Sequence, residues 1–196
     1  MDSGQWTVDF SFLSMIMTHQ RTIYTIGHST RPLEQFIQLL DSFHVKFVAD
    51  IRSFPGSKRY PHFNKEVLQK SLEDHQISYR HFPELGGRRK VAKDSKNSAW
   101  KNESFRAYAD HMDDPDFKEG IKKLEQIASQ TETAFMCSEA VWWRCHRSLV
   151  SDYLKWKGWD VQHIMDINKS TTHPYTKPAK IIDGKLNYSG FPDLLF

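Results

Sequence analysis

The sequence predicts an α/β domain of the Rossmann-like or flavodoxin-like class, a three-layer sandwich around a mainly parallel five-stranded sheet. Short β-rich segments alternate with segments of helical periodicity, which is the pattern of a parallel sheet covered on both faces. The length of 196 residues fits one domain, and 39% hydrophobic with 26% charged residues is a globular balance. Because right-handed crossovers leave few topologies, we expect the strand order 3-2-1-4-5.

The first half of the chain predicts three strands and two helices. The strands cover 22–26, 46–51 and 77–82, and the first of them stops at a glycine. Apolar residues at helical spacing follow Pro32, which suits the first position of a helix. A second helix is expected after Asn64, a good N-cap residue.

The second half opens with a polar segment over 83–101, which is too long for a simple connector and is therefore a candidate functional loop. The remaining elements are helices over 103–112 and 116–129, a strand over 133–137, a helix that ends at Gly158, and a strand over 160–165.

The two ends of the chain have a different character. Residues 1–20 are predicted to be an N-terminal extension outside the fold, and Met17 is a candidate for the genuine start. The single α/β domain is expected over 21–196. From about residue 168 we expect an irregular tail, with a short hairpin around Asp183-Gly184.

Composition excludes several classes of protein. Two cysteines cannot form a disulfide framework, and no apolar run approaches the roughly 18 residues of a membrane span. We expect a cytoplasmic protein with free thiols and no membrane partner. The net charge of +3 gives only weak general attraction to nucleic acid. Nothing in the sequence predicts the oligomeric state.

Three polar segments are expected to meet at one crevice. In open α/β sheets, ligands bind beyond the carboxyl ends of strands where the strand order reverses. The predicted order puts this point between strands 1 and 4. It places Gly27-His28-Ser29 beside Cys137-Ser138-Glu139, with Asp50 and Arg52 one strand away.

The residues at this crevice suggest two roles. Thiols, imidazoles and a carboxylate can act as nucleophiles, bases or acids, whereas arginines, hydroxyls and glycine N–H groups hold anions. The catalytic candidates are Cys137, Glu139, His28, Cys145 and His146. The anion-binding or substrate-binding candidates are Gly27, Ser29, Asp50, Arg52, Arg88, Arg89 and Arg147.

Each of these groups also has a purely structural interpretation. A cysteine at the end of an apolar strand is often a small buried hydrophobic residue. Asp50 and Arg52 can form an ordinary salt bridge, and Gly27-His28-Ser29 can be a turn that caps the next helix. The basic stretch Gly86-Gly87-Arg88-Arg89-Lys90 can be a solvated loop or a segment that closes over a phosphorylated ligand.

Two sharper interpretations concern the cysteines. Cys137, Cys145, His146 and Glu139 are all suitable zinc ligands, but no CxxC or HxxxH spacing supports a metal site, and none is predicted. A phosphatase-like thiolate loop is rejected because bulky residues replace the usual glycines and Arg144 falls one position late.

Six segments carry a resemblance to a known family: TIGHST (25–30), ADIRSFPGSKRYPHFN (49–64), ISYRHFPELGGRRK (77–90), SFRAYADHM (104–112), MCSEAVWWRCHRSLVSDYL (136–154) and VQHI (161–164). Over about residues 22–190 the chain resembles the bacterial and archaeal family known as domain of unknown function 488. The resemblance implies a Rossmann-like domain. It also implies a shared polar cluster at Gly27, His28, Ser29, Asp50, Arg52, Cys137, Glu139, Cys145, His146 and Arg147. It brings no established activity, and the cofactor, if there is one, stays unknown.

The expected function is that of an enzyme acting on a small anionic substrate, nucleotide-like or derived from nucleic acid. Two alternatives stay open. One is a binding module for nucleotides or nucleic acid without catalysis, which rests on the basic loop and on Trp100. The other is a Cys/His domain that holds a metal.

Overall fold

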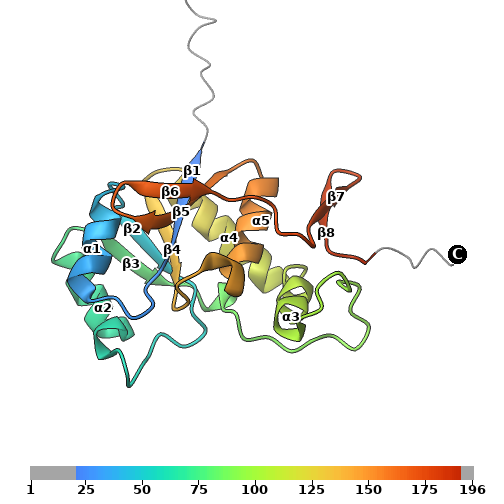
Figure 1. The fold of residues 1–196 in the computed structure, drawn as a ribbon, viewed down its shortest axis with the longest axis horizontal. Helices are drawn as coiled ribbons and strands as arrows, with labels where there is room; N and C mark the ends of the chain where they lie inside the picture. Colours follow the sequence, from blue (N-terminus) through green and yellow to red (C-terminus); the bar gives the residue numbers. More distant parts are fainter. Residues whose placement is uncertain (1–20, 191–196) are drawn as a thin grey trace, which may run out of the picture.

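The computed structural model describes residues 21–190 and has a six-stranded sheet at its centre (Figure 1). The strands are β1 (Thr22–Gly27), β2 (Phe47–Asp50), β3 (Ser78–His81), β4 (Thr133–Cys137), β5 (Asp160–Asp166) and β6 (Lys169–Thr172). Their order is β3-β2-β4-β1-β5-β6, and all neighbours are parallel except β5 and β6. The mainly parallel Rossmann-like class is confirmed. The predicted extension over 1–20 lies outside the described residues.

The strand order corrects the expected 3-2-1-4-5, because β4 lies between β2 and β1 rather than beyond β1. Burial explains the central position of β4. All five of its residues are buried, and it forms parallel ladders with both β1 and β2. The polar strand β3, whose residues are exposed or half-buried, takes the edge instead. The expected adjacency of β1 and β4 is nevertheless correct, and β2 is one strand away from the crevice as predicted, beside β4 instead of β1.

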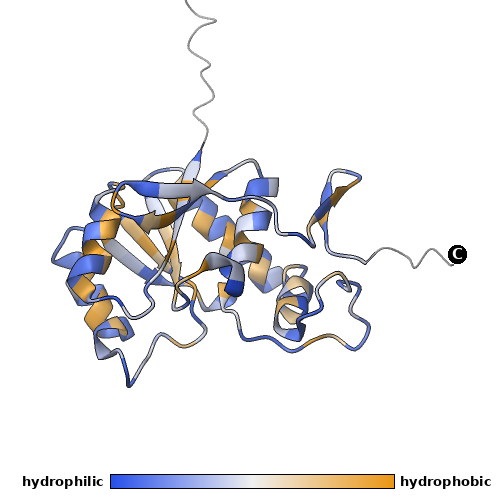
Figure 2. Ribbon diagram, in the orientation of Figure 1, coloured by the Kyte–Doolittle hydropathy of each residue, from blue (hydrophilic) through white to orange (hydrophobic). Residues whose placement is uncertain are grey.

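Helices cover both faces of the sheet, which gives the three layers. They are α1 (Leu33–Asp41), α2 (Lys65–Glu73), α3 (Glu103–His111), α4 (Pro115–Ala128) and α5 (Arg147–Trp156), with short 3-10 turns η2 (Pro61–Phe63), η3 (Pro83–Leu85) and η4 (Trp142–Arg144). The helices α1 and α2 pack in one apolar core, and α3, α4 and α5 pack in the other. Figure 2 shows apolar residues along the strands and on the helix faces that meet them.

The tail contributes a sixth strand that the sequence did not predict. All four residues of β6 are exposed, so the strand has no hydrophobic alternation by which to recognise it. Beyond it, β7 (Lys180–Ile182) and β8 (Lys185–Asn187) form a hairpin. Its turn is Asp183-Gly184, where both φ angles are positive, as a tight hairpin turn requires.

The connections after β1 and β4 prepare the site. The chain leaves β1 toward α1 on one face and leaves β4 toward α5 on the other face. Adjacent strands whose connections separate in this way open a crevice at their carboxyl ends. No helix within 21–190 is long and apolar enough to cross a membrane.

Candidate functional site

A cavity of about 790 Å³ opens at the carboxyl ends of β1, β2 and β4. Its volume lies in the range of small-molecule sites. Eight of the predicted site residues line it: His28, Ser29, Arg52, Arg88, Cys137, Glu139, Cys145 and His146. The structure therefore brings together side chains that are more than a hundred residues apart in the sequence.

Four predicted residues, Gly27, Asp50, Arg89 and Arg147, do not line the cavity. Gly27 lies behind it because of a close backbone approach: a Cβ atom there would overlap the carbonyl oxygen of Glu139. The backbone N–H groups of His28 and Ser29 donate to the carbonyls of Cys137 and Ser138 at 3.0 and 2.9 Å. These contacts hold the segment after β4 against the end of β1.

Arg147 is a buried structural residue. Its exposed fraction is 2%, and its guanidinium donates to the carbonyls of Glu139 (2.6 Å) and Ala140 (3.3 Å) and to Oγ1 of Thr25 (3.1 Å). It thus fixes the segment that carries Glu139 rather than facing a ligand. Arg89 has a similar role, because it donates to two backbone carbonyls of the η3 turn and to the carbonyl of Gly86, which follows the turn.

Asp50 holds Arg52 in a fixed orientation. The two side chains are buried, Nη2 of Arg52 lies 2.6 Å from Oδ2 of Asp50, and Nε contacts both carboxylate oxygens. The hydroxyl of Tyr79 donates to the same carboxylate. The remaining nitrogen, Nη1 of Arg52, lies 3.4 Å from Nε2 of His28. The salt bridge therefore fixes the guanidinium of Arg52 in the cavity wall and leaves Nη1 without a bond to the carboxylate.

His28 is neutral near pH 7. Burial, followed by the charge of Arg52, lowers the pKa of His28 to about 4. Its Nδ1 donates to the carbonyl of Ser29 at 2.9 Å, and its ring stacks on Phe63. A base of this strength takes up few protons at neutral pH. The ring positions Arg52 more readily than it transfers protons.

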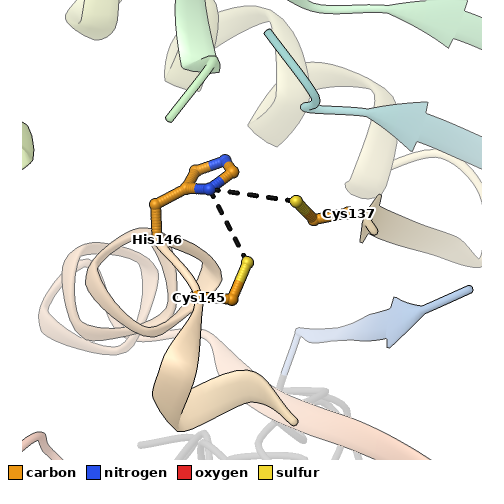
Figure 3. Close-up of side chains that lie close together, drawn as sticks. All are labelled: Cys137, Cys145 and His146. Atoms are coloured by element: carbon orange, nitrogen blue, oxygen red, sulfur yellow. Dashed lines mark hydrogen bonds between the residues drawn. The ribbon is translucent and has the colours of Figure 1, made fainter. Parts of the chain in front are cut away.

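Cys137, Cys145 and His146 form a compact cluster in the cavity wall (Figure 3). Nδ1 of His146 lies 3.6 Å from Sγ of Cys145 and 3.9 Å from Sγ of Cys137. Nε2 of His146 lies 3.0 Å from the carbonyl oxygen of Ile51. Because a carbonyl only accepts, Nε2 carries the proton, and the lone pair of Nδ1 points toward the two sulfur atoms.

The two thiols differ in acidity. The hydrogen bond to Cys145 and burial raise the pKa of Cys137 to about 12. Burial also acts to raise the pKa of Cys145, but the hydrogen bond from Cys137 and the charge and backbone N–H of Arg147 outweigh it and lower this pKa to about 7. Cys145 is therefore the thiol that loses its proton first.

Gly87 packs directly on His146. A Cβ atom at this position would overlap Nδ1 and lie 2.8 and 2.9 Å from Cγ and Cε1 of the imidazole. These distances place the glycine over the face of the ring, so it leaves the in-plane lone pair free. Gly87 therefore allows the backbone of the long loop to approach the cluster closely.

The open side of the cavity combines positive charge with aromatic rings. Arg88 places its guanidinium over the ring of Phe54 at 5.4 Å, and its backbone N–H donates to Oγ of Ser53. Arg88 and Arg144 are exposed, and neither forms an ion pair with a described residue. The aromatic and cationic lining residues that the sequence did not predict as site residues are Phe54, Tyr60, Phe105 and Arg144. Arg144 directly precedes Cys145-His146 in the sequence, and this position could have identified it as a candidate.

The chain belongs to the family described as Domain of unknown function DUF488, whose model matches residues 32–154. This match confirms the resemblance and includes all three members of the Cys-His cluster. No curated protein and no solved structure shows significant similarity to the chain.

Proposed function

We propose that this member of the DUF488 family is an enzyme that acts on a small anionic, nucleotide-like substrate in the cavity of about 790 Å³. One observation carries the proposal. A Cys-His cluster and a carboxylic acid residue share a cavity with arginines whose positive charge can bind an anionic ligand. Reactive groups and anion-binding groups in one cavity are the usual composition of an active site.

Arginines account for the anionic part of the substrate. Arg52 is oriented by Asp50, and Arg88 and Arg144 extend from the loop after β3 and from η4. Phosphate groups are bound well by such planar, multiple donors. Because the three side chains come from three separate segments, the substrate would link the walls of the cavity when it binds.

Aromatic side chains support the nucleotide-like part of the proposal. The rings in the cavity wall are those of Phe54, Tyr60 and Phe105. Phe54 is 68% exposed and already stacks with the guanidinium of Arg88. A planar base can use the same face.

Glu139 is the proton-transfer group of the proposal. Glu139 lines the same cavity as the Cys-His cluster, and its backbone carbonyl accepts a hydrogen bond from Arg147. It forms no ion pair with a described residue, so it is available to a substrate or to a water molecule.

The test begins with nucleotide binding. We expect nucleoside mono- and diphosphates to raise the melting temperature of the protein, and this effect to disappear in Arg88→Ala and Arg144→Ala. Arg80→Ala is the matched control, because it removes one exposed arginine charge outside the cavity wall. Equal stabilisation of all three variants contradicts the assignment of the cavity.

Turnover is tested next, on the nucleotides that bind. We expect phosphate or base release by the wild type and its loss in Glu139→Gln, with unchanged binding and folding. Binding without turnover in the wild type favours the alternative of a non-catalytic nucleotide-binding module. Turnover that survives in Glu139→Gln removes this residue from the proposed mechanism.

A further inference from the structure

We propose that Cys137, Cys145 and His146 bind one zinc ion, with a fourth coordination position that opens into the cavity. The three side chains come from the end of β4 and from the start of α5. The inference deepens the proposed function, since it concerns the same cavity. Zinc binding itself needs no substrate, and so it can be tested separately.

The distances in the cluster are those of a tetrahedral zinc centre. With zinc bonds of about 2.3 Å to sulfur and about 2.05 Å to nitrogen, tetrahedral angles put sulfur and nitrogen about 3.6 Å apart. The observed distances from Nδ1 of His146 are 3.6 Å to Cys145 and 3.9 Å to Cys137. All three ligand atoms lie within 4.8 Å of one another.

A hydrogen-bonded arrangement accounts for these distances less well. The single in-plane lone pair of Nδ1 can accept one thiol proton at a time, yet both sulfur atoms lie at similar distances from it. An ion placed between the three atoms makes use of both thiolates and the lone pair together. Figure 3 shows one nitrogen of the imidazole pointing toward the sulfur atoms of both Cys137 and Cys145.

The surroundings of His146 are also those of a metal ligand. Zinc-binding histidines usually donate the second ring nitrogen to a carboxylate or a backbone carbonyl, which fixes the tautomer. Nε2 of His146 makes such a bond to the carbonyl of Ile51 at 3.0 Å. Gly87 packs on the ring face and restricts its rotation. The ligand is thus oriented before an ion arrives.

The donor set selects zinc among the common divalent ions. Two thiolates and one imidazole suit zinc, whereas magnesium and calcium require oxygen ligands. Three protein ligands with an open fourth position are typical of catalytic zinc, and structural zinc usually has four. The fourth position here faces the cavity shared with Glu139. Zinc held there would lower the pKa of a bound water molecule, and Glu139 is the carboxylate in the same cavity that could accept a proton.

The experiment is a metal titration of the full chain. Protein is stripped with a chelator under reducing conditions and titrated with Zn²⁺ in the presence of a competing chromogenic chelator. A parallel titration uses Co²⁺. We expect one ion per chain, thiols that react more slowly with Ellman's reagent after zinc addition, and a cobalt spectrum with thiolate charge-transfer bands and strong tetrahedral d–d bands.

Variants then assign the ligands. Cys137→Ser, Cys145→Ser and His146→Asn should each weaken zinc binding by at least about tenfold. The matched control is His75→Gln, which removes an exposed histidine at the end of α2. The wild-type cobalt spectrum does not depend on whether a ligand variant folds, so it tests the same assignment independently.

Two results would overturn the inference. One is a reduced, folded wild-type protein that takes up no zinc and gives no thiolate–cobalt bands. The other is zinc binding that is unchanged in all three ligand variants. If zinc binding fails while nucleotide binding still depends on Arg88, the proposed function stands without the metal.

Discussion

Arg144 and Arg147 are three residues apart, and their surroundings give them different tasks. Arg144 is exposed in the cavity wall, whereas Arg147 is buried and donates to the carbonyls of Glu139 and Ala140. The residue type alone had made Arg147 a candidate for anion binding, because arginines hold anions well. Only the path of the chain through η4 and into α5 determines which of the two arginines faces the cavity.

The variant Arg147→Met tests this division at the residue scale. It leaves two carbonyls and the hydroxyl of Thr25 without their donor, so we expect the free energy of unfolding to fall by about 1–3 kcal/mol. Urea denaturation measures this loss. The matched variant Arg144→Met should stay within about 0.5 kcal/mol of the wild type. A stable Arg147→Met protein with impaired anion binding would restore the original assignment.

Gly87 provides a second test at this scale. In Gly87→Ala, the new methyl group would overlap the face of the His146 ring, so the imidazole must leave its present position and its lone pair no longer points at the two sulfur atoms in the same way. We expect zinc affinity to fall by at least about tenfold, as when a supporting residue of a metal site is lost. Gly56→Ala is the control, because its Cβ atom has no neighbour closer than 3.9 Å. Equal zinc affinity in the two variants would contradict the role given to Gly87.

At the scale of elements, a chain of buried polar groups links β5, the segment after β6, and α5. Nε2 of His163 lies 2.9 Å from Nδ1 of His173, and Nε2 of His173 lies 3.0 Å from Asp152. Trp142 of η4 stacks on His163 in parallel at 4.4 Å between centroids. This chain therefore joins the edge of the sheet to the helix that begins beside the Cys-His cluster.

The same chain predicts how stability changes with pH. Burial, followed by the charges of His173 and Arg147, lowers the pKa of His163 to about 2. The folded protein thus keeps His163 neutral, while the unfolded chain takes up a proton below about pH 6.5. The contribution of the neutral His163 to the free energy of unfolding is therefore full above about pH 6.5 and is lost as the pH falls below it. At pH 5 the loss is about 2 kcal/mol for this group.

Urea denaturation at pH 7.5 and pH 5 checks this expectation. His163→Gln should lose about 2 kcal/mol less than the wild type over this interval, because it removes the group that protonates on unfolding. His28, whose pKa is also lowered, adds a loss of the same sign in both proteins. An identical pH dependence of the two proteins would show that His163 is not kept neutral by the fold.

The whole molecule depends on its tail more than the sequence indicated. Asp152 is fully buried, and its carboxylate accepts from His173, from the backbone and hydroxyl of Thr176, and from the hydroxyl of Tyr188. The tail thus supplies most of the donors for a buried carboxylate of α5. A segment that looks irregular by composition is an integral part of the fold.

Tyr188→Phe tests the attachment of the tail. The change removes one hydrogen bond to a buried carboxylate, so we expect a loss of about 1.5–3 kcal/mol in the free energy of unfolding. The matched control Tyr175→Phe removes a hydroxyl from a partly exposed ring and should have little effect. A stability of Tyr188→Phe equal to that of the wild type would contradict this role of the tail.

Local patterns predicted the sheet class, the helices and the adjacency of β1 and β4. They could not predict that β4 enters between β1 and β2, because a crossover that skips one strand position leaves no trace in local periodicity. The polar strand β6 was not predicted either, because it has no alternation of apolar and polar residues. In the site, residue chemistry identified the cysteines and His146, but the distances between them come from tertiary packing.

The most direct measurement is a crystal structure of the zinc-treated protein grown with a nucleoside monophosphate that stabilises it in solution. We expect the phosphate within hydrogen-bond distance of Arg52 and Arg88, and the base against Phe54. We also expect anomalous scattering from zinc between Cys137, Cys145 and His146. A saturating nucleotide bound elsewhere, with only solvent in the cavity, would contradict the proposed site.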